Sequence, residues 1–243
     1  ATQFVWLLLN CGWAGFWLRL IRPRFTDNIR KMMRRIVPVA IGAGVYQVSL
    51  LTDTIIASLL PSGSISFLFF ADRVNQLPLG VVGVAVGTAL LPLMSRQLRV
   101  ADYKGALESQ NRAIEFSLFL TLPAAVGLVV LAEPTISVLF ERGAFDADSV
   151  KSTSGALAMY AIGLPAYVVI KALVPGFFAR EDTATPVKIA VAALSINLVL
   201  NLVLMGPFLH IGIAVATAIS AWCNALALAF VLKRRGYFTL DLR

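Results

Sequence analysis

Four ionisable side chains lie within apolar stretches that are long enough to cross a bilayer. They are Asp53, Asp72, Arg73 and Lys171. A charge at membrane depth is costly, so such residues usually serve a binding site or a transport path. Lys171 lies near enough to one end of its stretch to extend its ammonium group to the lipid headgroups, so its position also has a simple structural explanation.

Asp53 is matched in depth by polar residues of other stretches. Asn201 and Thr217, like Asp53, lie five to seven residues from the predicted external ends of their stretches. At about 1.5 Å per residue they share a layer roughly 8–11 Å deep. Asn197 lies one helical turn below Asn201 on the same face. Their carboxylate, amide and hydroxyl oxygens suit a small cation, although asparagines also hold membrane helices together.

Arg73 falls in the same layer, seven residues from its predicted external end. A guanidinium stays charged when it is desolvated, and its planar fork of donors suits a phosphate or diphosphate. The alternative is that Asp53 and Arg73, at matching depth on neighbouring antiparallel helices, neutralise each other.

The stretch that carries Arg73 also contains Pro78, Gly80 and Gly83. Proline interrupts the helical hydrogen-bond ladder and kinks the axis. The pattern predicts a static kink or a hinge at these three residues, and a bend there would redirect the Arg73 guanidinium.

The composition indicates a membrane protein. Of the 243 residues 58% are hydrophobic and 14% charged, with a mean hydropathy of +0.81, whereas soluble domains carry about 25% charged residues. Crossing a hydrocarbon core of ~30 Å takes about 20 apolar residues. We predict an all-α, polytopic membrane helix bundle with seven apolar stretches, at roughly 1–21, 37–60, 66–94, 113–132, 153–178, 187–206 and 211–232.

The basic residues gather in alternate loops. If the stretches alternate in direction, most of the 21 Lys and Arg lie on one side, which an excess of basic residues marks as cytoplasmic. The stretch at 133–150 is acidic and too short to span, so we place it at the other membrane surface. The net charge of +8 therefore reflects topology and anionic lipid headgroups, and we expect no nucleic-acid partner.

The sequence contains no recognisable catalytic motif. Both cysteines lie in apolar stretches and there is a single histidine, His210. We find no Walker loop, dinucleotide fingerprint, HExxH or nucleophile elbow. We therefore expect no enzyme activity, and energy for transport from an ion gradient, the membrane potential or the substrate. The chain begins inside an apolar run without Met, so we expect it to be part of a longer protein.

Two long motifs resemble one known family. The first is Phe70-Ala-Asp-Arg-Val followed by Leu77-Pro-Leu-Gly-Val-Val-Gly-Val-Ala-Val-Gly-Thr-Ala-Leu-Leu-Pro92. The second is Lys171-Ala-Leu-Val-Pro-Gly-Phe-Phe-Ala-Arg-Glu-Asp-Thr-Ala-Thr-Pro-Val-Lys188. Both are similar to the MurJ/MviN family of lipid II flippases, in the superfamily of multidrug, oligosaccharidyl-lipid and polysaccharide exporters.

The resemblance implies a domain organisation. Members usually have fourteen transmembrane helices in two lobes around a central cavity, and this chain resembles the sixth through the twelfth. Residues 1–21 would be the last helix of the N-lobe, 22–36 a basic cytoplasmic linker, 37–232 the six-helix C-lobe bundle and 233–243 a cytoplasmic tail.

The resemblance also implies a function. Such a protein moves lipid II from the inner to the outer leaflet of the bacterial cytoplasmic membrane by alternating access, in cell-wall biosynthesis. Arg73 matches the family's cavity arginine, which engages the diphosphate-sugar headgroup. Asp53, Asn197, Asn201 and Thr217 fall where members can hold a sodium ion, which is the only cofactor expected. The expected partners are lipid II and membrane lipids, without an oligomer.

Two other functions stay open. One is export of another polyprenyl-linked polysaccharide or of a drug by a member of the same superfamily. The other is a non-transporting membrane scaffold for cell-wall enzymes, in which the polar layer only packs helices. The scaffold predicts that the charge at position 73 is dispensable.

Overall fold

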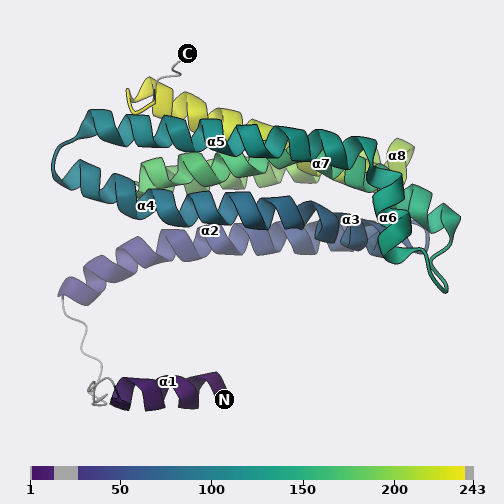
Figure 1. The fold of residues 1–243 in the computed structure, drawn as a ribbon, viewed down its shortest axis with the longest axis horizontal. Coiled ribbons are helices and arrows are strands. Elements are labelled where there is room, and N and C mark those ends of the chain that lie inside the picture. Colours follow the sequence, from purple (N-terminus) through teal and green to yellow (C-terminus); the bar gives the residue numbers. More distant parts are fainter. Residues whose placement is uncertain (1, 14–26, 239–243) are drawn as a thin grey trace. The chain divides into compact units, whose positions relative to one another are not determined.

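The computed structural model describes residues 2–13 and 27–238, and within these ranges the chain is helical without strands. This confirms the all-α prediction. The elements in chain order are α1 (Thr2–Trp13), α2 (Asp27–Ser58), α3 (Ser64–Pro78), the π-helical turn η1 (Leu79–Gly83), α4 (Val84–Arg99), α5 (Tyr103–Val130), α6 (Ala132–Phe140), α7 (Ala147–Phe178) and α8 (Ala184–Arg234) (Figure 1).

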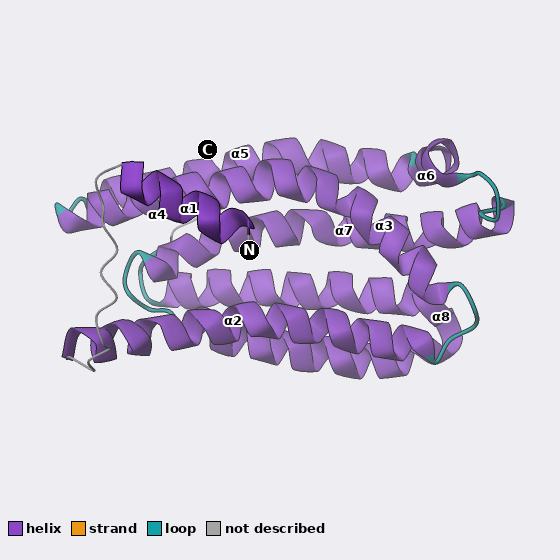
Figure 2. Ribbon diagram, turned by 90° about the horizontal axis from the view of Figure 1, so that it is seen from below, coloured by secondary structure: helices purple, strands orange, loops and turns teal. Residues whose placement is uncertain are grey.

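The chain divides into two compact units, residues 1–36 and 37–243. The first unit contains α1 and the beginning of α2. The second contains the rest of α2 and all later helices, and every candidate site residue belongs to it. Its α3–η1–α4 run, α5 and α7 lie lengthwise beside one another (Figures 1 and 2).

Four helical runs of the described chain are long and apolar enough to cross a membrane. They are Ser64–Arg99, Tyr103–Val130, Ala147–Phe178 and Ala184–Arg234. The first combines α3, η1 and α4, and all four begin or end beyond the apolar stretches predicted for them. The polar residues at these ends include good helix formers, which continue a helix past the hydrocarbon core.

The 51-residue α8 folds back on itself at Leu209, whose φ of 51° and ψ of −134° are not helical. The side chains of Asn197 and Thr217 meet at 3.3 Å, although 20 residues of straight helix would separate them by about 30 Å. The turn separates the predicted stretches 187–206 and 211–232, so α8 supplies two antiparallel helical limbs.

Helix α7 is the centre of the second unit. It packs against α3, η1, α4, α5, α6 and α8, and 56% of its most apolar stretch is buried, against 17–22% in the other three runs. Small residues permit this packing, because a Cβ at Gly163 would lie 3.0 Å from the Cα of Ala218 in α8.

The predicted irregularity in the Arg73 segment is present as a π-helical turn. Pro78 ends α3, and Gly80 and Gly83 lie within the following five-residue turn, η1. Proline lacks the N–H that would continue the α-helical ladder, and a π-turn is one way to absorb that loss. A hinge motion at this point stays a prediction.

The observed helices extend beyond the boundaries predicted for the C-lobe at both of its ends. Helix α2 begins at Asp27, so most of the predicted linker 22–36 is helical, because its arginines and lysines are good helix formers. At the other end Lys233 and Arg234 complete α8, and Phe238 is buried within the predicted tail. Residues 14–21 of the predicted first span lie outside the described residues, and α1 covers Thr2–Trp13.

Candidate cation site in a helix-lined cavity

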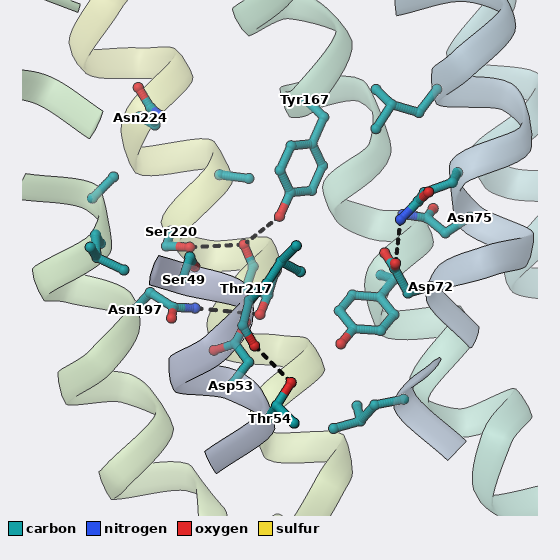
Figure 3. A pocket seen from close by; sticks show the side chains of 18 of the residues that line it. Ser49, Asp53, Thr54, Asp72, Asn75, Tyr167, Asn197, Thr217, Ser220 and Asn224 are labelled. Carbon is teal, nitrogen blue, oxygen red and sulfur yellow. Dashed lines mark hydrogen bonds between the residues drawn. The ribbon is translucent and has the colours of Figure 1, made fainter. Parts of the chain in front are cut away.

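A cavity of about 380 Å³ lies between α2, α3, α7 and α8 (Figure 3). Each of these helices contributes polar side chains to its otherwise largely apolar wall: Ser49, Asp53, Thr54, Asp72, Asn75, Gln76, Tyr160, Tyr167, Lys171, Asn197, Thr217, Ser220 and Asn224. At ~30 Å³ per water, such a volume holds on the order of ten water molecules. It therefore suits a small ion and its hydration water.

The four predicted cation ligands form one hydrogen-bonded row. Asn201 donates from Nδ2 to Asp53 Oδ1 at 2.6 Å and to Asn197 Oδ1 at 3.1 Å. Asn197 in turn donates from Nδ2 to the Thr217 hydroxyl at 3.3 Å. The row runs from α2 to both limbs of α8. The depth match predicted from the sequence is therefore a direct contact in the structure.

Helical geometry explains why these side chains meet. Asn197 and Asn201 are four residues apart on one limb of α8, so they project from the same face. The turn at Leu209 brings Thr217 back beside them, and α2 supplies Asp53. Figure 3 shows Asp53, Asn197 and Thr217 together on one side of the cavity.

The row offers oxygen atoms that suit a cation. Asn201 is fully buried, and its Oδ1 has no hydrogen-bond partner among the described residues. Leaving such an oxygen unsatisfied costs about 1–3 kcal/mol. The Thr217 hydroxyl donates to the Ile213 carbonyl at 2.8 Å and accepts from Asn197, so one lone pair of its oxygen remains for a further partner. With the Asp53 carboxylate, these are hard ligands of the kind that bind alkali and alkaline-earth ions.

Arg73 lies apart from this row. It is exposed on α3, with its guanidinium carbon 4.7 Å from the centre of the Phe69 ring, and it is not part of the cavity wall. Within the described residues no ion pair joins it to Asp53. The mutual neutralisation considered for the two charges is therefore not formed, because Asp53 is bound by Asn201 instead.

Comparison with known proteins decides the family. A family model described as "Lipid II flippase MurJ" matches residues 1–242. The chain belongs to the MurJ family. It is 46% identical over 229 residues to a probable lipid II flippase MurJ of Rhizobium meliloti strain 1021, covering 94% of this chain and 43% of that protein. It is 35% identical over 221 residues to the lipid II flippase MurJ of Burkholderia cenocepacia, covering 91% of this chain and 43% of that protein. The chain therefore spans less than half the length of these relatives.

Solved structures agree with this assignment. A structure titled as lipid II flippase MurJ in an inward closed conformation matches with a TM-score of 0.77 and 29% identity, over 90% of this chain and 46% of that one. An outward-facing multidrug transporter of the MATE family matches with a TM-score of 0.77 over 91% of this chain and 51% of that one. At 19% identity it supports the fold alone. This MurJ-family chain is thus part of a multi-pass membrane protein with a transporter fold.

The sequence of this MurJ-family chain left several cavity residues unrecognised. Asn75 is buried with an unpartnered Oδ1 among the described residues, and Gln76 donates to the Asp72 carboxylate. The sequence pattern could have identified them, since Asp72, Asn75 and Gln76 share one helical face within an apolar stretch. Lys171 also lines the cavity rather than only serving the headgroups.

Proposed function

We propose that the protein containing this chain is a lipid II flippase, which moves the lipid-linked peptidoglycan precursor from the inner to the outer leaflet of the bacterial cytoplasmic membrane by alternating access. The observation that carries this proposal is the family match over residues 1–242, supported by relatives that bear this name. It acts as a transporter rather than an enzyme. Because the chain spans less than half of those relatives, the activity belongs to the whole protein.

Arg73 is the headgroup-binding residue in this proposal. A permanently charged side chain exposed in the membrane-crossing run Ser64–Arg99 is poorly tolerated by lipid. It therefore calls for an anionic partner or an aqueous cavity. A diphosphate meets this requirement with paired charge-assisted hydrogen bonds. Arg73 is not part of the wall of the 380 Å³ cavity, so the headgroup in this proposal binds on the Arg73 face of α3.

Asp53, Asn197, Asn201 and Thr217 hold a sodium ion in this proposal. The support is the hydrogen-bonded row and the buried, unpartnered Asn201 oxygen within the described chain. A bound cation would neutralise the Asp53 carboxylate and satisfy that oxygen. Since the Asn201–Asp53 bond joins α8 to α2, a bound ion would add a second connection between the two helices at this depth.

The turn η1 gives the proposed movement a location. Arg73 lies less than two helical turns before it, and Pro78, Gly80 and Gly83 form or border it. A change of axis there moves the Arg73 face relative to α4. Alternating access further requires a fixed topology, for which we propose that the basic loops are cytoplasmic, with α6 at the external surface.

The test compares full-length wild type with Arg73→Ala and Arg73→Lys in cells depleted of their own flippase. The readout is the fraction of lipid-linked precursor exposed on the outer face, at matched abundance in the membrane. We expect Arg73→Ala to abolish exposure and Arg73→Lys to retain part of it, because a lysine keeps the charge but loses the planar fork. Arg112→Ala, at an exposed arginine of α5, is the control.

Two results would contradict the proposal. If the wild type fails to restore precursor exposure, another polyprenyl-linked polysaccharide or a drug becomes the better substrate class. If both Arg73 variants restore exposure fully, Arg73 does not bind the headgroup. If the wild type restores cell-wall synthesis without changing precursor exposure, the non-transporting membrane scaffold becomes the better explanation.

A further inference from the structure

Lys171 adds a basic group to a cavity that contains two carboxylates. It lines the wall from α7, together with Asp53 from α2 and Asp72 from α3. Its side chain is exposed, and a charged residue of a membrane-crossing helix that lines a polar cavity is a candidate for a role in that cavity. Its presence in the same small cavity as two acids therefore needs a reason.

Close helix packing holds the Lys171 backbone at the cavity. A Cβ at Gly83 would lie 3.5 Å from Lys171 Cγ, and a Cβ at Gly87 would lie 3.6 Å from the Lys171 carbonyl oxygen. Pro175, four residues later, lacks the N–H that would bind this carbonyl. Residues 83 and 87 therefore lie in contact range of Lys171, so η1 and α4 pack against α7 at the residue that carries the charge.

The ammonium of Lys171 does not form an ion pair with either carboxylate among the described residues. Asp53 accepts a hydrogen bond from Asn201, and Asp72 accepts one from Gln76. Arg73 follows Asp72 in the sequence, but its guanidinium lies over Phe69 and outside the cavity wall.

We propose that Lys171 sets the charge of this cavity so that it accepts one monovalent cation and excludes divalent cations. Two carboxylates and one ammonium leave the wall with a single net negative charge, which one monovalent ion balances. A divalent ion would leave an uncompensated positive charge between helices, where charge interactions are stronger than in bulk water. An ammonium group has no acceptor atom, so Lys171 acts by repulsion rather than as a ligand.

This inference rests on the proposed cation site, and it deepens it by naming the residue that excludes divalent ions. It also predicts the direction in which a mutation changes the affinity for the cation. Removing a ligand weakens cation binding, whereas removing Lys171 removes a repulsion and strengthens it. A residue that only supported the fold would weaken binding or leave it unchanged.

The experiment measures binding of Na⁺ and of Ca²⁺ to the full-length protein in detergent by isothermal titration, with ionic strength held constant by choline chloride. Lys171→Met keeps a linear side chain but removes the charge. We expect it to bind Na⁺ about tenfold more tightly, equivalent to about 1.4 kcal/mol, and to gain saturable Ca²⁺ binding. Lys171→Arg keeps the charge and should behave as wild type, as should Lys151→Met, at an exposed lysine of the same helix.

Each outcome decides the proposal. Unchanged or weaker Na⁺ binding by Lys171→Met, or Ca²⁺ binding by the wild type, overturns the role of Lys171 and leaves the cation site standing. Absence of saturable Na⁺ binding in the wild type overturns the cation site and this inference together. Lys171→Gln takes the place of Lys171→Met if the latter does not elute as a folded protein, with the same expected result.

Discussion

The side-chain amide of Asn201 donates to the Asp53 carboxylate at 2.6 Å, joining residues 148 positions apart in the sequence. This bond connects α8 to α2 at the depth where the cavity lies. The same amide also bonds Asn197, so one side chain holds both the acid and the rest of the row in place. The row thereby links a candidate ion site directly to the relative position of two helices.

Asp53→Asn should weaken sodium binding by the full-length protein at least tenfold, or about 1.4 kcal/mol. The substitution keeps the shape of the side chain but removes the carboxylate charge of the row. Isothermal titration with Na⁺ measures the change. Ser195→Ala is a suitable control, because this exposed hydroxyl of α8 donates to the Val191 carbonyl of its own helix. Unchanged affinity in Asp53→Asn would remove Asp53 as a ligand.

Asn201→Asp should have the opposite effect. A second carboxylate beside Asp53 increases the attraction for a cation, and we expect sodium to bind about tenfold more tightly. Without sodium the two carboxylates repel each other in a buried position, so the thermal midpoint in sodium-free buffer should fall below that of wild type. If the thermal midpoint of Asn201→Asp is the same with and without sodium, this prediction is wrong.

Gly163→Ala should destabilise the packing of α7 on α8. The added methyl would lie 3.0 Å from the Cα of Ala218, a backbone atom that cannot move alone, and overpacking of this kind costs about 1–3 kcal/mol. Gly127→Ala in α5 is the matched control, because a Cβ there meets nothing within 4 Å. Thermal unfolding in detergent should show a lower midpoint for Gly163→Ala only. Equal midpoints would show that the two helices separate readily.

Asp182 should stabilise the fold in a pH-dependent way. It lies between α7 and α8, where partial burial raises its pKa, but hydrogen bonds from Thr185 and from Arg235 outweigh this and leave the pKa below its usual value. A carboxyl with a lowered folded-state pKa stabilises the fold above its unfolded pKa of about 3.9, and this contribution is lost as the pH falls through the folded-state value.

Asp182→Asn should therefore cost about 0.5–1 kcal/mol near neutral pH, because the pair with Arg235 is partly exposed to solvent. The difference from wild type should vanish at the acid end of a thermal-unfolding series measured from pH 7 downward. Glu108→Gln, at an exposed acid of α5, controls for the general effect of losing a carboxylate. A difference that stays constant across the series would argue against the ionised pair.

The sequence alone was sufficient to predict the membrane helices, the shared depth of three polar residues and the family. Apolar stretches with few charges predicted membrane helices, because a bilayer requires long segments whose backbone bonds are satisfied internally. Depth could be counted along those helices, since each residue adds a fixed rise. That count grouped Asp53, Asn201 and Thr217, which the structure joins through Asn197 in one row. The motif around Arg73 also predicted the family that the comparisons establish.

Only the tertiary structure decided which residues share a cavity. Arg73 matched Asp53 in depth but lies on another face of α3, whereas its neighbour Asp72 lines the cavity together with Lys171. A soluble helix reveals its inner face by its apolar stripe, but a membrane helix is apolar all round because lipid and protein core are equally apolar. Depth can therefore be read from the sequence of such a helix, while the direction in which each side chain points depends on how the helices pack.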